Sequence, residues 1–211
     1  VDYLTTTYAL PLRPEIHSEE GLPSYLARLA LANQCRKAAW IGEICDARVP
    51  GVVWDVGAAE RLADLVRGEA ADFRDKVYQQ QDYGIRVRGH TLPKEAVATH
   101  RAGVCPSCLD ELGYRPWFWD LTVIEACPDH EVQLLQTCPG CGGSLSRIPF
   151  CVTECACGYD LRSADAAPAL GNEVDLAAWT RAIIRGATFA PTEYGPELDL
   201  QGFLELNAVL G

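Results

Sequence analysis

The chain has 211 residues and a formal charge of −11, from 18 basic and 29 acidic side chains. Hydrophobic residues make up 48 % and charged residues 22 %, a balance typical of one or two globular domains that excludes a disordered chain. No stretch approaches the length of continuous apolar sequence that a transmembrane helix needs. The first residues lack the pattern of a signal peptide, so we expect a cytoplasmic protein.

The charge is unevenly distributed along the chain. Residues 1–104 hold 13 basic and 14 acidic side chains, whereas residues 105–211 hold 5 and 15. Because a phosphate backbone attracts cations, any nucleic-acid contact is expected in the first half, while the acidic second half suits a basic protein surface.

The first elements are expected to be helical after an extended start. Prolines at positions 11 and 14 mark residues 1–21 as extended. A helix is predicted over residues 22–33, with Pro23 at an early position, where proline is favoured. A second apolar cluster predicts a short helix over residues 38–44, which ends before Pro50 and Gly51.

The clearest helical pair lies between residues 55 and 81. Asp55 can cap a helix whose apolar side chains recur at helical spacing as far as Val66, and Gly68 follows as a stop signal. A second helix is expected from Ala70 to about Gln81. Two short helices joined by a glycine-containing turn are typical of a DNA-binding helix-turn-helix, and a plain helical hairpin gives the same pattern.

Residues 82–104 form the one basic run of the sequence. They are polar and have no helical period, so a solvated linker is one interpretation. The other is a strip that faces DNA phosphates. Its candidate contacts are Arg86, Arg88, Lys94 and Arg101.

The cysteines carry the most specific signal. Ten are present, and eight of them fall between residues 105 and 157. A chain of this length can bury a core without a disulfide framework, so closely spaced cysteine pairs indicate metal sites or redox motifs. Four pairs in series exceed what a redox motif needs. The expected metal ligands are Cys105, Cys108, Cys127 and His130, followed by Cys138, Cys141, Cys155 and Cys157.

This spacing predicts two structural Zn²⁺ ions held by small β-hairpins. Each tight turn presents two ligands, and two turns supply the four that structural zinc prefers. We favour Cys155 and Cys157 as the last pair because residues two apart share one face of a strand, although Cys151 can replace either. A cross-braced pairing of the first turn with the third also stays open. Cys35, Cys45 and Cys151 are then expected to be buried thiols.

The protein is not expected to be an enzyme. The sequence lacks a zinc-deaminase signature, a His-Glu-x-x-His motif, a Gly-x-Ser-x-Gly motif and a phosphate-binding loop. Four protein ligands also leave no open position at which a metal could activate water.

Two amphipathic helices are predicted after Pro168. The first carries Leu176 and Ile184 and ends near Gly186, and Asp199 can cap the second. Large aromatic residues in and after the cysteine-rich region are expected to pack in the core. These residues are Trp117, Phe118, Trp119, Trp179 and Phe203. One of Trp117, Phe118 and Trp119 can instead be exposed and anchor a partner protein.

Three segments resemble the TniQ family of transposition target-selection proteins. Residues 21–30, Gly-Leu-Pro-Ser-Tyr-Leu-Ala-Arg-Leu-Ala, are similar to the opening helix of the family. Residues 104–130 carry Cys-Pro-x-Cys, two tryptophans and Cys-x-x-His, the motif that is most specific to the family. The Cys-Pro-Gly-Cys and Cys-Ala-Cys segments at 138–141 and 155–157 complete a resemblance over residues 10–165.

The resemblance implies a non-enzymatic adaptor with a helix-turn-helix-like part and two zinc fingers. Such proteins recruit an AAA+ transposition regulator and its transposase to a target. They recognise the target either by contacting DNA directly or through an RNA-guided CRISPR complex. A direct DNA-binding protein of transposition or transcription is the alternative, and the oligomeric state stays open, a homodimer included.

The predicted architecture is therefore mainly α with small zinc-held β-hairpins, an α+β fold. We expect an N-terminal helical, helix-turn-helix-like domain over residues 1–104, a tandem zinc-finger domain over residues 105–165 and a C-terminal helical segment over residues 166–211.

Overall fold

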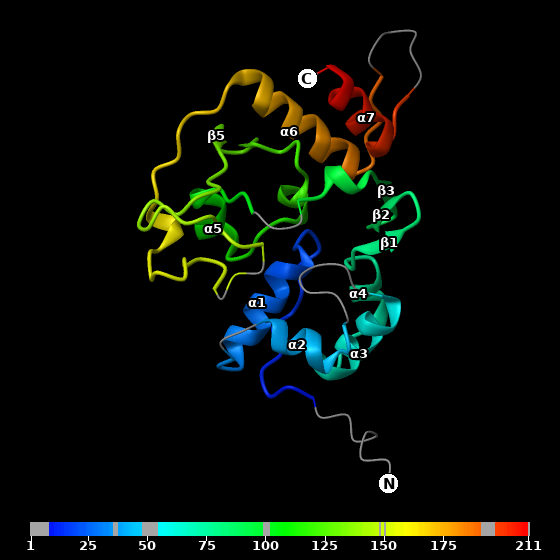
Figure 1. Ribbon diagram of the computed structural model, residues 1–211, viewed down its shortest axis with the longest axis vertical. Helices are drawn as coiled ribbons and strands as arrows, with labels where there is room; N and C mark the ends of the chain where they lie inside the picture. Colours follow the sequence, from blue (N-terminus) through cyan, green and yellow to red (C-terminus); the bar gives the residue numbers. More distant parts are fainter. Residues whose placement is uncertain are drawn as a thin grey trace.

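Figure 1 shows the computed structural model of the chain, which describes residues 9–35, 38–47, 55–98, 102–147, 149, 151–190 and 197–210. Four helices form the N-terminal part: α1 (Leu22–Ala32), α2 (Ala39–Ile44), α3 (Val56–Val66) and α4 (Ala70–Arg74). An antiparallel sheet of order β1-β2-β3 follows, with β1 (Gln79–Gln81), β2 (Gly84–Val87) and β3 (His90–Leu92). The result is a mixed α/β fold in which the sheets are small.

The cysteine-rich region and two further helices complete the chain. They comprise the 3-10 helix η1 (Lys94–Ala96), α5 (Pro106–Leu112), η2 (Trp117–Asp120), the antiparallel pair β4 (Ala126–Cys127) and β5 (Val132–Gln133), η3 (Leu161–Ser163), α6 (Gly171–Ile184) and α7 (Leu200–Leu210). Figure 1 shows the N-terminal helices at one end of the molecule and α6 running across the other end, with the cysteine-rich loops between them.

The first three helices confirm the sequence prediction. Helix α1 begins after Gly21 and carries proline in its first turn. Helix α3 is capped by Asp55, whose Oδ1 accepts a hydrogen bond of 2.6 Å from the Ala58 N–H. It ends in a left-handed residue at Arg67, where the Gly68 N–H donates back to the carbonyl of Ala63.

The predicted second helix of the pair is too long. Helix α4 ends at Arg74, and residues 79–81 form a strand in which Gln80 lies opposite Ile85 of β2. The helical spacing of Ala70, Phe73 and Val77 suits a helix locally. Beyond α4, however, the backbone N–H and C=O groups of residues 79–81 form hydrogen bonds with β2. The spacing of nearby apolar residues gives no information about this partner strand.

The polar run after residue 81 is also a sheet rather than a linker. Strand β2 alternates buried Ile85 and Val87 with exposed Arg86, the period expected of a half-buried strand. A two-residue turn joins β2 to β3, and both of its residues, Arg88 and Gly89, have positive φ. Such turns match the twist of a hairpin.

The cysteine-rich region contains one α-helix, α5, that the sequence pattern did not predict. Cys105 directly precedes α5, and Pro106 occupies the first helical position, where proline is favoured. The strands of the β4–β5 hairpin are two residues each, so turns and isolated bridges make up most of the remaining region.

Two hydrophobic clusters form the core. One lies among α1 to α4, and the other combines the sheet, the cysteine-rich region, α6 and α7. The second cluster therefore draws on all three predicted domains, and the division into those domains stays a prediction. Among the described residues, no helix is both long and apolar enough to cross a membrane.

Most of the predicted aromatic anchors are buried. Trp117, Phe118, Trp119 and Phe203 are each at most 4 % exposed, so none of the first three is a surface anchor. The prediction for Trp179 is wrong, because this side chain is 49 % exposed. The buried face of α6 consists of Ala177, Thr180 and Ile183, which leaves Trp179 at the surface against Phe189.

Candidate metal centres

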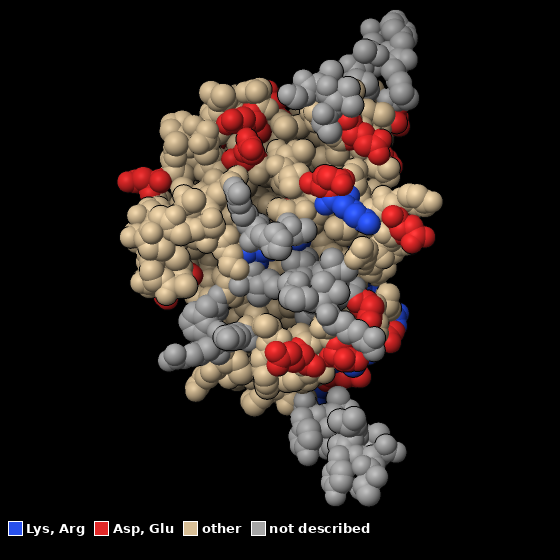
Figure 2. All heavy atoms as spheres, viewed as in Figure 1, with Lys and Arg blue, Asp and Glu red and all other residues tan. Residues whose placement is uncertain are grey.

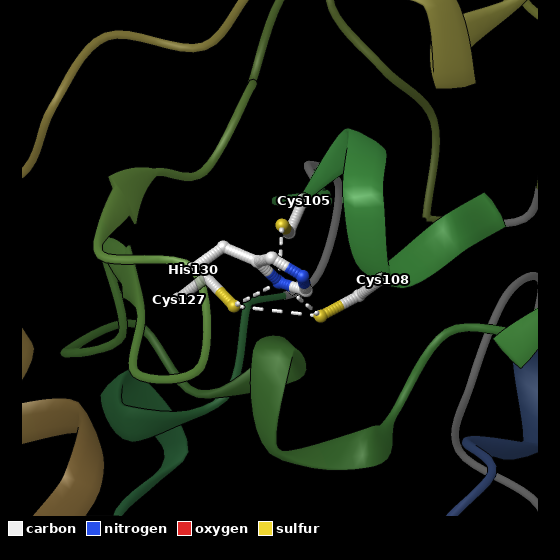
Figure 3. Close-up of side chains that lie close together, drawn as sticks. All are labelled: Cys105, Cys108, Cys127 and His130. Carbon is white, nitrogen blue, oxygen red and sulfur yellow. Dashed lines mark hydrogen bonds between the residues drawn. The ribbon is translucent and has the colours of Figure 1, made fainter. Parts of the chain in front are cut away.

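The first cluster forms where the start of α5 meets the β4–β5 hairpin. Cys105 and Cys108 come from the cap and first turn of α5, while Cys127 lies in β4 and His130 in the following turn. In Figure 3 the four side chains point toward one another. The turn closes through a hydrogen bond of 2.9 Å from the Glu131 N–H to the Cys127 carbonyl.

The distances within this cluster suit one tetrahedral metal ion. The Sγ atoms of Cys108 and Cys127 lie 3.4 Å apart, and His130 Nδ1 lies 3.3 Å from Cys108 Sγ and 3.6 Å from Cys105 Sγ. Tetrahedral zinc with sulfur at about 2.3 Å and nitrogen at about 2.0 Å places such atoms roughly 3.5–3.8 Å apart. A disulfide, by contrast, needs about 2.05 Å. The four side chains therefore fit a metal ion and not a disulfide.

Protons compete for the sulfurs of this cluster. Hydrogen bonds from the thiols of Cys105 and then Cys108 lower the pKa of Cys127, so its thiolate is favoured. The same contacts with Cys105 and Cys127 raise the pKa of Cys108. A divalent ion bound at this point would replace the protons and stabilise all three thiolates at once.

Glu111 is a site residue that the sequence analysis missed. Its Oε1 lies 3.0 Å from Nε2 of His130, one helical turn after Cys108 on α5. This contact leaves Nδ1 of His130 facing the sulfurs. Metal-binding histidines typically donate their second ring N–H to a carboxylate, which fixes the tautomer and the ring orientation. The sequence signal that could have indicated Glu111 is its position three residues after Cys108, which places both side chains on one face of a helix.

The second cluster consists of Cys138, Cys141, Cys155 and Cys157. Cys138 Sγ lies 3.7 Å from Cys157 Sγ, and Cys141 Sγ lies 3.9 Å from Cys155 Sγ. In each cluster the four donor atoms all lie within 4.8 Å of one another. Each group of four can therefore hold one metal ion, and the chain pairs neighbouring turns rather than cross-bracing them.

Close packing of turns shapes the second cluster. A Cβ atom on Gly140 would lie 2.7 Å from the ring of Tyr159, so only glycine fits between the two turns. Cys155 and Cys157 lie on a tight turn that ends at Gly158, not on the strand that the sequence analysis assumed. A turn brings both sulfurs to one ion as effectively as a strand face does.

The other three cysteines lie outside both clusters. Cys151 is buried, with its sulfur 3.4 Å from the Thr153 hydroxyl. Cys45 is fully buried, and burial raises its pKa to about 12, so it stays a neutral thiol. Cys35 is half-buried.

The predicted nucleic-acid contacts are in different environments. Arg86 and Lys94 are exposed, and their side chains form no ion pair with a described residue. Arg88 turns inward, where its guanidinium donates to the carbonyls of Ser18 and Glu20 and lies 5.4 Å from the ring centroid of Trp117. Arg101 lies outside the described residues.

A buried charge network joins the cysteine-rich region to Tyr78, the residue before β1. Tyr78 donates a hydrogen bond of 2.6 Å to Asp120 Oδ2, and Arg147 Nη2 donates to the same oxygen at 3.1 Å. The Arg147 guanidinium also lies 4.5 Å from the ring centroid of Tyr78. Because Arg147 lies between the two halves of the second cluster in sequence, the network attaches that cluster to the core.

Comparison with known proteins identifies the family. None of the curated proteins compared with the chain matches it. The TniQ family model matches residues 11–134, a span that includes α1 and the whole first cluster and ends before the second. Because this span covers more than half of the 211 residues, the chain belongs to the TniQ family.

Proposed function

We propose that this protein is a non-enzymatic adaptor of DNA transposition that links target-site recognition to recruitment of an AAA+ regulator and its transposase. The observation that carries the proposal is the TniQ family match over residues 11–134. The chemistry of the clusters supports it. Each offers four protein donors, a set that leaves no coordination position for a reacting water.

Both clusters are proposed to hold Zn²⁺ as a structural ion. Three cysteines with a histidine, and four cysteines, are donor sets typical of structural zinc. A bound ion would cross-link short turns that bury little core of their own. Metal analysis of the purified protein should give two zinc ions per chain, and a single ion would contradict the two-site proposal.

The surface charge supports a basic protein partner. All five cations of residues 105–211 are engaged within the chain: Arg162, Arg181 and Arg185 form ion pairs, and the buried Arg147 and Arg115 bind Asp120 and main-chain carbonyls respectively. Figure 2 shows acidic side chains spread over one face of the molecule with few basic ones beside them. Such a surface attracts a basic partner and repels acidic proteins.

A pull-down with a cognate AAA+ transposition ATPase tests the adaptor role. The zinc-loaded protein is expected to retain the ATPase. Cys127→Ser should lose both the first metal ion and the ATPase, because Cys127 is a buried ligand. Cys151→Ser, a change at a buried cysteine outside both clusters, is the matched control and should keep both. An intact, zinc-loaded protein that does not bind the ATPase would contradict the proposal.

Direct DNA contact is the second candidate, and the observation in its favour is the exposed hairpin. Tyr83 at the β1–β2 tip is 96 % exposed, and Arg86 and Lys94 lie exposed without ion-pair partners among the described residues. The helix pair itself is less suitable, since residues 55–76 hold six acidic and four basic side chains. DNA retention should fall with salt and with Arg86→Glu plus Lys94→Glu. Unaltered retention would exclude this candidate.

A further inference from the structure

A pocket of about 520 Å³ lies between the extended segment 13–18 and the turn that joins α3 to α4. Tyr25 and Phe73 form its floor, and both side chains are at most 2 % exposed. Three cations stand around it: Arg13, Arg67 and Lys76. A cavity of this size accommodates a small molecule or a few residues of a peptide.

The three cations come from three separate parts of the chain, and none of them forms an ion pair with a described residue. This is unusual in so acidic a protein, in which seven other described arginines form ion pairs. Two more, Arg88 and Arg115, donate to main-chain carbonyls. Five described cations remain, and three of them line this pocket, whereas Arg86 and Lys94 lie elsewhere.

Arg67 occupies a position that normally favours glycine. It ends α3 with φ of +52°, a left-handed conformation that costs a residue with a side chain about 1–2 kcal/mol. Backbone strain of this kind persists at binding sites, where the side chain has a role that compensates for it. Here the exposed Arg67 side chain lines the pocket.

Lys76 lines the pocket two residues after the end of α4. Its Nζ donates a hydrogen bond of 2.8 Å to the Asp72 carbonyl, which leaves two of its three N–H groups for a ligand. Burial and the charge of Arg88 lower the pKa of Lys76. An anion bound beside it would offset both effects.

The extended segment also offers unpaired main-chain groups. The N–H groups of Arg13 and Ile16 donate to no described residue, whereas the Leu12 N–H and the Glu15 carbonyl are bound by Asn33 and Arg28. An extended chain laid along this segment can pair with such groups, as in strand addition.

From these observations we infer that the pocket binds an extended acidic peptide segment of a partner protein. Its carboxylates would bind Arg13, Arg67 and Lys76, and its main chain would lie along segment 13–16. A peptide fits better than a nucleic acid for two reasons. The buried floor rings present no face on which a base can stack. Glu15 and Asp72 also line the pocket. They repel a phosphate backbone, which is charged at every nucleotide, more strongly than a peptide whose carboxylates are separated by uncharged residues. The site stands whether or not the chain acts in transposition.

Fluorescence anisotropy with the metal-loaded full chain tests this inference. The probe is a fluorescein-labelled peptide of alternating valine and glutamate, and the same peptide with glutamine is its control. The glutamate peptide should bind and the glutamine peptide should not. Arg67→Gly should weaken binding by about tenfold, the value of one charge-assisted hydrogen bond. Its melting temperature should stay equal or rise, because glycine relieves the left-handed strain.

Two further variants make the test specific. Lys76→Gln should weaken binding like Arg67→Gly, whereas Arg86→Gln, at an exposed and unpaired arginine that does not line the pocket, should leave it unchanged. Amide shifts in a nuclear magnetic resonance titration should centre on residues 13–16 and 67–76. The inference is overturned if the glutamate peptide does not bind at millimolar concentration, or if Arg86→Gln weakens it equally. Tighter binding of a single-stranded oligonucleotide that is likewise lost in Arg67→Gly would also overturn it.

Discussion

At the scale of single residues, the most consequential polar group is Asp120. It is 6 % exposed and is the carboxylate partner of Arg147, whose side chain is 2 % exposed. Burial and the Asp120 charge raise the pKa of Tyr78, so the Tyr78 hydroxyl stays protonated and keeps donating to Asp120. Removing one member of such a network leaves the others desolvated and without a partner.

Asp120→Ala is therefore expected to destabilise the protein by about 3–5 kcal/mol, because it leaves the buried Arg147 cation without its carboxylate. Tyr78→Phe removes one hydrogen bond and keeps the ion pair, so it should cost about 1–2 kcal/mol. Urea unfolding of the zinc-loaded protein measures both values. Equal losses for the two variants would show that the ion pair adds nothing beyond the hydrogen bond.

Glu111 is expected to strengthen metal binding at the first cluster by orienting His130. Glu111→Ala should lower the metal affinity of that cluster by about tenfold or more, as for other carboxylates that orient a ligand histidine. Competition with a chromophoric chelator measures the change. Asp110→Ala removes the neighbouring exposed carboxylate of α5 and is the matched control. A similar loss in both variants would assign the effect to surface charge instead.

At the scale of elements, the caps of α3 and α7 are local features that the sequence predicted and the structure confirms. The Asp55 carboxylate accepts from the Ala58 N–H, and Asp199 accepts from the Gly202 N–H at 2.9 Å. Asp55→Ala should cost about 1 kcal/mol and Asp55→Ser should cost much less, since serine caps equally well. Thermal unfolding distinguishes the two. A loss that serine does not restore would point to the weak ion pair with Arg61.

Local signals predicted α1, α2 and α3 well, and they failed at the end of α4 and in the sheet. Proline in the first turn marks the start of α1, and Asp55 and Gly68 mark the start and the end of α3. Strand β1 depends on β2, so the apolar spacing through Val77 predicted a helix where a strand forms. The sequence does contain a pattern typical of the β2–β3 hairpin, namely the alternation of apolar and polar residues around Ile85 and the glycine after Arg88. The basic side chains of this segment favoured the interpretation as a linker or a DNA-facing strip instead.

The metal clusters were predictable for a different reason. The spacing of cysteine and histidine indicates which side chains can bind one metal ion together. The structure brings the same eight residues together in two groups of four. Spacing does not specify the backbone between them, which is why α5 and the turn at Cys155 differ from the expected hairpins. Nor does it indicate long-range contacts such as that between Arg147 and Asp120, which depend on the tertiary fold.

At the scale of the whole molecule, the two clusters differ in how they are embedded. In the first metal cluster Cys105 and Cys127 are fully buried. Both belong to the second hydrophobic cluster, which combines the sheet, the cysteine-rich region, α6 and α7. In the second cluster Cys141 and Cys157 are exposed. The first ion would therefore stabilise the core itself, whereas the second would hold a peripheral set of turns that Arg147 attaches to the core.

We accordingly expect a chelator to remove the two ions in order, the second cluster first. Exposed sulfurs are open to attack by the chelator, whereas buried ones are released only after the surrounding core opens. Native mass spectrometry should show a species with one ion before the metal-free protein. Hydrogen exchange of that species should be fast at residues 138–161 and still slow in α5 and β4.

Single substitutions provide the control for this order. Cys157→Ser should yield a folded protein with one ion, because Cys157 is an exposed ligand of the second cluster. Cys127→Ser should expose much of the second hydrophobic cluster and reduce protection in the sheet and in α6 as well, because Cys127 packs with those elements. Simultaneous loss of both ions, or equal effects of the two substitutions, would mean that the clusters form one cooperative unit. In that case Arg147 and its partners would couple the exposed turns to the core more strongly than their burial indicates.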